Sequence, residues 1–169
     1  QIDAGCVMAV SQQVNFDIDK DHNDLANTKS IFVITKDADQ NALDMSVDIG
    51  RNKITIKLPE RDYFRYQSMS QANEVQDTLN SMIIIPALVY VLSEISRRSP
   101  DDRDLDFGSY NWYKSIRKVM KKRFKKDLDG DELDATEIVG YAQRLIKSPM
   151  TGALEYLALG CNGEEEDDE

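Results

Sequence analysis

Histidine and cysteine, which supply most zinc sites and all disulfides, are scarce in this chain. Its 169 residues include one histidine, His22, and two cysteines, Cys6 and Cys161, near opposite ends. Two cysteines do not make the disulfide framework of a small secreted domain, and one histidine adds too little for an ordinary zinc site. We therefore expect a reduced, cytoplasmic compartment and no bound metal.

Motifs that cradle a phosphate or activate a nucleophile are also missing. The eight glycines form neither G-x-G-x-x-G nor G-x-x-x-x-G-K-[ST]. No serine or cysteine stands in a nucleophile motif, and His22, within "DKDHNDLAN", is expected to be a loop residue. The sequence therefore predicts no cofactor and favours a protein without catalytic activity.

Long apolar runs are absent too. The longest, "MIIIPALVYVL" at 82–92, has eleven residues, whereas a membrane-spanning helix needs about 20. We expect it to be the centre of a core helix over 71–98, the hub of a helical bundle, and we expect no membrane partner. Pro86 predicts either a kink near 82–86 or the first turn of a new helix.

Basic residues are outnumbered, but unevenly along the chain. The net charge is −10 at pH 7, and six of the negative charges belong to the run "EEEDDE" at 164–169. Such a run predicts a disordered acidic tail over 161–169, which solubilises the chain or shields a basic surface. The rest is mildly acidic, so general affinity for nucleic acids is not favoured.

The acidic segment "DLDGDELD" has the composition of a calcium-binding loop but not its spacing. An EF-hand loop that began at Asp127 would need glycine at its sixth position, where the sequence has Glu132. We expect a turn between two helices instead. In that turn Gly130 ends the first helix with a positive φ, and Asp134 with Glu137 forms a capping box for the second.

Alternating apolar and polar residues predict strands in the first sixty residues. Short apolar segments stand at 6–10 and 30–35, and "LDMSVDIG" and "KITIKL" flank the loop "GRN" to predict a hairpin over 43–58. We expect a sheet that is covered on one side only. The residues expected on its buried face in the first hairpin strand are Leu43, Met45, Val47 and Ile49.

Beyond residue 60 the apolar period becomes helical. Helices are predicted at 110–126, 135–147 and 150–159, a short helix or an arm at 61–69, and a polar loop at 99–109. In the last helix Leu154 and Leu157 are expected to face inward. In the helix predicted at 110–126, one apolar stripe is expected to comprise Trp112, Tyr113, Ile116, Val119, Met120 and Phe124.

These elements predict an α+β fold. An N-terminal antiparallel β-hairpin or sheet over 1–60 packs on a C-terminal bundle of four to five helices over 61–160, and the acidic tail over 161–169 follows. The β region either stands alone or is the end of a larger N-terminal β domain.

Lysine and arginine concentrate in the predicted helix 110–126. This stripe could lie along phosphates, meet an acidic protein or the chain's own tail, or form a solvated face whose lysine stems cover the apolar stripe. The candidate contact residues for nucleic acid or a protein partner are Lys114, Arg117, Lys118, Lys121, Lys122, Arg123 and Lys125.

A metal-dependent nuclease or hydrolase is a further alternative. Asp44, Asp48 and Lys57 lie on the predicted hairpin, and two carboxylates with a lysine can hold Mg²⁺ and activate water. The same residues fall on the polar face of alternating strands, for which solvation is the simpler interpretation.

Three segments resemble a known family. "NSMIIIPALVYVLSEI", followed by "WYKSIRKVMKK" and preceded by a strand pair that ends in "ITIKLPE", is similar to the C-terminal portion of a family of uncharacterised bacterial and phage-type proteins. The resemblance covers roughly residues 28–159 and implies a longer parent chain with more β-structure before Gln1. It carries over no activity and no site residues.

The function that we expect is that of a non-catalytic interaction or assembly module, the C-terminal part of a larger phage or bacterial protein. A protein partner or a second copy would bind, for example through an open sheet edge. Nucleic-acid binding through 114–126 is the alternative.

Overall fold

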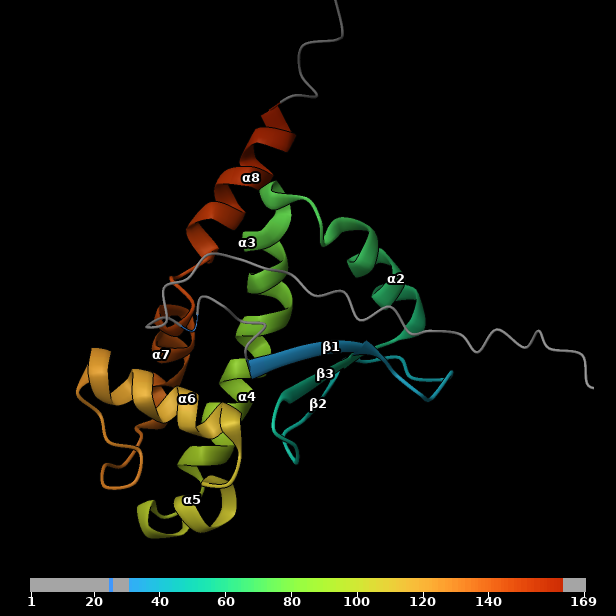
Figure 1. Ribbon diagram of the computed structural model, residues 1–169. Coiled ribbons are helices and arrows are strands. Elements are labelled where there is room, and N and C mark those ends of the chain that lie inside the picture. The colour runs from blue at the N-terminus through green and yellow to red at the C-terminus, as the bar shows by residue number, and fades with distance from the viewer. Residues whose placement is uncertain (1–24, 26–30, 163–169) are drawn as a thin grey trace, which may run out of the picture.

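The computed structural model describes Leu25 and residues 31–162, and shows a small sheet followed by a bundle of helices (Figure 1). The α+β fold class is therefore confirmed, while the strand predicted at 6–10 lies outside the described residues. The elements are β1 (Phe32–Lys36), β2 (Ser46–Asp48), β3 (Ile54–Leu58), α2 (Glu60–Met69), η1 (Asn73–Val75), α3 (Gln76–Leu79), η2 (Asn80–Ile84), α4 (Ile85–Ser96), α5 (Pro100–Phe107), α6 (Asn111–Val119), η3 (Met120–Phe124), η4 (Ala135–Glu137), α7 (Ile138–Leu145) and α8 (Met150–Asn162).

The three strands are ordered β1-β3-β2, with β3 in the centre. β2 runs antiparallel to β3 and places Val47 opposite Ile56, so the predicted hairpin is confirmed. β1 runs parallel to β3, with Phe32 opposite Ile54, so the sheet is mixed rather than antiparallel throughout. Alternation indicates which face of a strand is apolar, but it carries no information on the direction of the neighbouring strand.

One face of the sheet packs on the helices, as expected. Ile54 and Ile56 are fully buried, while Thr55 and Lys57 on the other face remain partly exposed. The exception is Leu43, which is 87% exposed and therefore does not join the buried face. It precedes β2, which begins only at Ser46, and alternation of faces holds only where the backbone is paired in a strand.

Residues Asn73–Ser96 form one continuous helix of 24 residues through the middle of the molecule (Figure 1). A π-helical turn, η2, lies directly before Pro86, and Pro86 lies in the first turn of α4, which agrees with the alternative that it starts a helical segment. A proline removes one backbone donor and crowds the preceding turn, and a wider π turn accommodates this. By length and composition the helix could span a membrane, although 39% of its most apolar stretch is buried in the protein and α4 supplies much of the core.

The segment predicted as the polar loop 99–109 is instead largely the helix α5. Pro100 in the first turn, followed by Asp101 and Asp102, is a typical helix start, and the polar composition concealed it. One face of α5 is buried through Phe107 and Arg103.

Arg103 is 1% exposed, which makes it the one buried charged residue among those described. Its Nε donates to the carbonyl oxygens of Ile95, in the last turn of α4, at 2.9 Å and of Arg98, just after α4, at 3.1 Å. Its Nη1 donates to those of Leu128 and Asp131, both at 2.7 Å. The arginine therefore joins the end of α4, the helix α5 and the acidic turn after η3, and satisfies carbonyls that would otherwise be buried without partners.

The sheet and the bundle share one hydrophobic core. The indole Nε1 of Trp112 on α6 donates to the carbonyl oxygen of Ile49 in the hairpin at 3.1 Å. The ring of Trp112 packs 5.5 Å from that of Phe107, between centroids. α6 is thus fixed to the hairpin on one side and to α5 on the other.

The last helix, α8, lies beside α3 and extends away from the rest of the bundle (Figure 1). It buries Ala153 against its neighbours, but Leu154 is 61% and Leu157 is 51% exposed, so the prediction that both face inward is wrong. The helix also continues through Cys161 to Asn162, past the point where the acidic tail was predicted to begin.

Candidate functional site: the basic helix and the acidic turn

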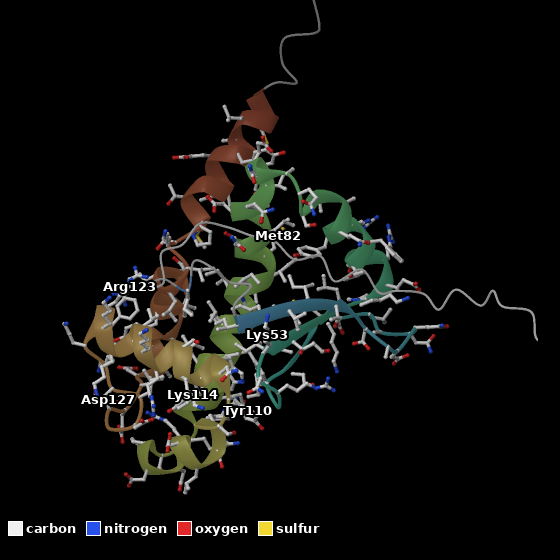
Figure 2. All side chains as sticks on the ribbon, viewed as in Figure 1. Lys53, Met82, Tyr110, Lys114, Arg123 and Asp127 are labelled. Atoms are coloured by element: carbon white, nitrogen blue, oxygen red, sulfur yellow. The ribbon has the colours of Figure 1, made fainter. Side chains whose placement is uncertain are left out.

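Six of the seven candidate cations lie on α6 and η3, and Lys125 follows directly. The predicted apolar stripe of this helix is confirmed, because Trp112, Ile116 and Met120 are all fully buried. The cations between them consequently point outward. Figure 2 shows Lys114 near one end of this helix and Arg123 near the other.

The helix ends at Lys125, which has a left-handed backbone with φ 57°. The amide of Lys126 then donates to the carbonyl oxygen of Met120 at 3.3 Å, which closes the last turn. The prediction that Gly130 ends the helix with a positive φ is wrong, since no described glycine has a positive φ.

The start of the next helix also differs from the predicted capping box. Asp134 accepts hydrogen bonds from the amide and the hydroxyl of Thr136, both at 2.8 Å, and thereby caps the short helix η4. These two bonds hold the pKa of Asp134 below its usual value. Glu137 instead accepts a hydrogen bond from the hydroxyl of Tyr141 at 3.2 Å.

The aspartates of the turn between the two helices contact α6. Asp129 accepts from Arg117 at 2.5 Å and from the hydroxyl of Tyr113 at 2.7 Å, and Asp127 accepts from Lys121 at 2.5 Å. The segment that has the composition of a calcium loop therefore binds the cations of its own chain. Among the described residues no group of three or more acidic, histidine or cysteine side chains is placed to hold a metal ion.

These contacts change the acidity of the groups involved. Burial raises the pKa of Tyr113, and the hydrogen bond to Asp129 raises it further. The hydrogen bond from Lys121 lowers the pKa of Asp127, and the same bond raises the pKa of Lys121. Burial by itself would lower the pKa of Arg117, but the carboxylates of Asp129 and Asp104 outweigh this and raise it.

The basic helix and the acidic turn enclose an open concavity of about 510 Å³. Four cations face two carboxylates there, so its net charge is positive but small. Arg117 and Lys121 are already paired, and Lys114 donates to the carbonyl oxygen of Ser109 at 3.3 Å. The lining residues are Lys114, Arg117, Lys118, Lys121, Asp127, Asp129 and Gly130.

Three candidate cations keep their charge available, Lys125 among them. Lys118 and Lys122 are exposed and have no hydrogen bond or ion pair to any described residue. Arg123 lies with its guanidinium 5.5 Å from the ring centre of Phe124. Only part of the predicted basic stripe therefore presents unpaired charge to solvent.

The residues of the hypothetical metal site are not assembled into one. Asp48 accepts a hydrogen bond from the amide of Gly50 at 2.9 Å and pairs with Arg51 at 3.9 Å, which stabilises the hairpin loop. Asp44 is exposed and precedes β2, and Lys57 lies opposite Ser46 rather than opposite either aspartate.

Exposed apolar side chains, which the sequence did not predict, are a second feature of the described residues. Large apolar side chains are exposed on α2, on the long central helix and on α8. A signal was present in the apolar centre of residues 82–92 and in the leucines of α8, which exceed what one buried face requires. The largest exposures among these helices are those of Phe64 (53%), Met82 (67%), Leu154 (61%), Leu157 (51%) and Leu159 (74%).

No family model, curated protein or solved structure matches this chain. The resemblance to bacterial and phage-type proteins therefore stays a prediction. The function is inferred from the geometry of the described residues.

Proposed function

We propose that this protein is a non-catalytic interaction or assembly module that binds protein through the exposed apolar side chains of its helices, as the C-terminal part of a larger phage or bacterial protein in the cytoplasm. The observation that carries the proposal is the exposure of Met82, Leu154, Leu157 and Leu159, each more than half accessible. Scattered exposed leucines are ordinary on a protein surface, but several on one helix indicate an interaction site.

The charged face of the molecule supports this proposal. Arg117 and Lys121 pair with Asp129 and Asp127 across the concavity, and Arg98 pairs with Asp106 at 2.7 Å. These polar groups contact one another, whereas the three leucines of α8 are each more than half exposed. Burial of apolar surface contributes about 25 cal/mol of favourable free energy per Å². Contact of a partner with the exposed leucines of α8 would therefore be favourable.

A photo-cross-linking amino acid placed at Met82 or at Leu154 tests the proposal in cells that produce the whole protein. We expect a protein adduct from at least one of these positions and none from the control position Asp101, an exposed acidic residue on α5. Absence of any protein adduct from both apolar positions would contradict the proposed function.

Nucleic-acid binding is a second candidate, favoured by the unpaired charges of Lys118 and Lys122. Reversal of both to glutamate should weaken binding to DNA or RNA, and the affinity of the unmodified protein should fall with salt. The matched control replaces Arg61 and Arg65 on α2 with glutamate, which changes the net charge by the same amount at another place on the protein. Equal loss in both double variants, or no binding at low salt, would refute a site on α6.

A further inference from the structure

Four exposed, uncharged residues lie along one line of α8. Met150 is 45%, Leu154 61% and Leu157 51% exposed, and Cys161 is also exposed. Successive members are four, three and four residues apart, which is the spacing of the apolar seam in a coiled coil. We call these four residues the α8 seam.

The α8 seam is separate from the face of α8 that packs inside the molecule. That inner face holds Ala153 and Gly152, and Gly152 lies so close to Asp77 that a Cβ would come within 2.1 Å of its carboxylate. At roughly 100° per residue, the seam is turned about a third of a revolution away from this face. α3 therefore does not cover the seam.

Resting on the proposed function, we propose that the partner is a second copy of this chain, and that two α8 helices pair antiparallel along their seams. The seam is self-complementary in that direction. When Leu154 lies opposite Leu157 of the partner subunit, Met150 lies opposite Cys161 of the partner subunit, so every position has an apolar counterpart.

Charge favours the antiparallel direction over the parallel one. Residues 164–169, six carboxylates, follow α8 in the sequence. In a parallel pair both acidic runs would follow the same end of the helix pair and repel each other, whereas in an antiparallel pair they follow opposite ends. An exposed cation stands shortly before the start of α8: Arg144, whose guanidinium is 5.1 Å from the ring centre of Phe124.

The same charge argues against a lipid surface as the occupant. The only charged residue of α8 is Glu155, and the acidic run follows the helix directly. Membrane-surface helices carry lysine and arginine beside their apolar face, because cytoplasmic lipid surfaces are negative. Glu155 lies off the seam, so it does not obstruct pairing with a second copy.

Sedimentation velocity of the whole chain over a concentration series tests the pairing. We expect a monomer–dimer equilibrium whose dissociation constant rises at least about tenfold in the double variant Leu154→Gln, Leu157→Gln, because four apolar side chains are lost from the symmetric interface. Leu159→Gln, which removes the most exposed leucine of α8 from another face, is the matched control and should leave the equilibrium unchanged.

Disulfide trapping tests the direction, in a Cys6→Ser background that leaves Cys161 as the remaining thiol. Added Met150→Cys should give rapid covalent dimers under a mild oxidant, whereas Cys6→Ser by itself should not, because antiparallel pairing separates the two Cys161 residues by roughly 16 Å. Rapid dimers from Cys6→Ser without Met150→Cys would overturn the antiparallel arrangement.

The failures of the two proposals can be told apart. The chain could stay monomeric at every concentration and still give a protein adduct from Met82 or Leu154 in cells. That result would contradict pairing of α8 but would agree with the proposed interaction module. A monomeric chain without any adduct would overturn both.

Discussion

Helices α6 and α8 have similar apolar patterns in the sequence but differ in how far the structure buries them. Both were predicted to place an apolar stripe against the core. In α6 the stripe is buried, with Trp112, Ile116 and Met120 at 0% exposure, whereas in α8 Leu154 is 61% exposed. The same periodicity thus accompanies a core helix in one place and a surface helix in the other.

The difference lies in the number of neighbours. α6 lies against the hairpin through Trp112 and against α5 through Phe107, so both flanks of its stripe are covered. α8 has α3 and η1 beside it and extends beyond the bundle (Figure 1). Periodicity therefore shows that a helix has an apolar face, but the rest of the chain decides whether anything covers that face.

The largest effect should come from the centre of the covered stripe. Trp112→Ala should lower the free energy of unfolding by about 3–5 kcal/mol, because it removes a fully buried ring and leaves the carbonyl of Ile49 without its donor. Chemical denaturation measures this loss. Trp112→Phe keeps part of the ring volume and should lose less; equal losses would show that packing of the ring contributes little.

A matched pair compares the two helices directly. Ile116→Ala on α6 should cost about 2–5 kcal/mol, because the side chain is fully buried and leaves a cavity. Leu154→Ala on α8 should change the stability of the monomer by less than about 0.5 kcal/mol. Both changes are measured by denaturation at low protein concentration. Similar losses of stability in the two variants would contradict the difference in burial between α6 and α8.

A smaller, stabilising effect is expected where the basic helix ends. Lys125 has φ 57°, a conformation that glycine adopts without strain, so Lys125→Gly should raise the free energy of unfolding by about 1 kcal/mol. The control Lys118→Gly, within α6, should lower it by about the same amount. A loss of stability in Lys125→Gly would mean that its side chain matters more than its backbone.

The smallest effect at neutral pH concerns Tyr113, on the polar edge of the covered stripe. Its pKa is raised in the folded protein by burial and by Asp129, so folding favours the protonated phenol. This stabilisation is fully present below the unfolded pKa of about 10 and is lost as pH rises toward the folded value. Alkaline denaturation followed through phenolate absorbance should therefore show a shallower fall in stability for Tyr113→Phe than for the unmodified chain, and identical slopes would contradict this assignment.

Local signals predicted much of the fold and of the candidate site. The hairpin, α2 and the buried face of α6 all follow from spacing within short segments. The exposure of the candidate cations on α6 follows from the same spacing, because a buried stripe leaves the opposite face to solvent.

The unpredicted features depend on residues far apart in the chain. Arg103 is buried because carbonyls from Ile95 to Asp131 converge on it, and nothing near Arg103 in the sequence announces them. The pairing of Asp129 with Arg117, which removes charge from the candidate site, likewise required the turn to fold back on α6.

By itself the sequence determined which faces of its strands and helices are apolar, because side-chain spacing and backbone geometry are local properties. The tertiary structure alone decided the parallel direction of β1, the burial of Arg103 and the exposure of the α8 seam. Each of these depends on which distant segment becomes a neighbour, and only the free energy of the whole packed chain determines that.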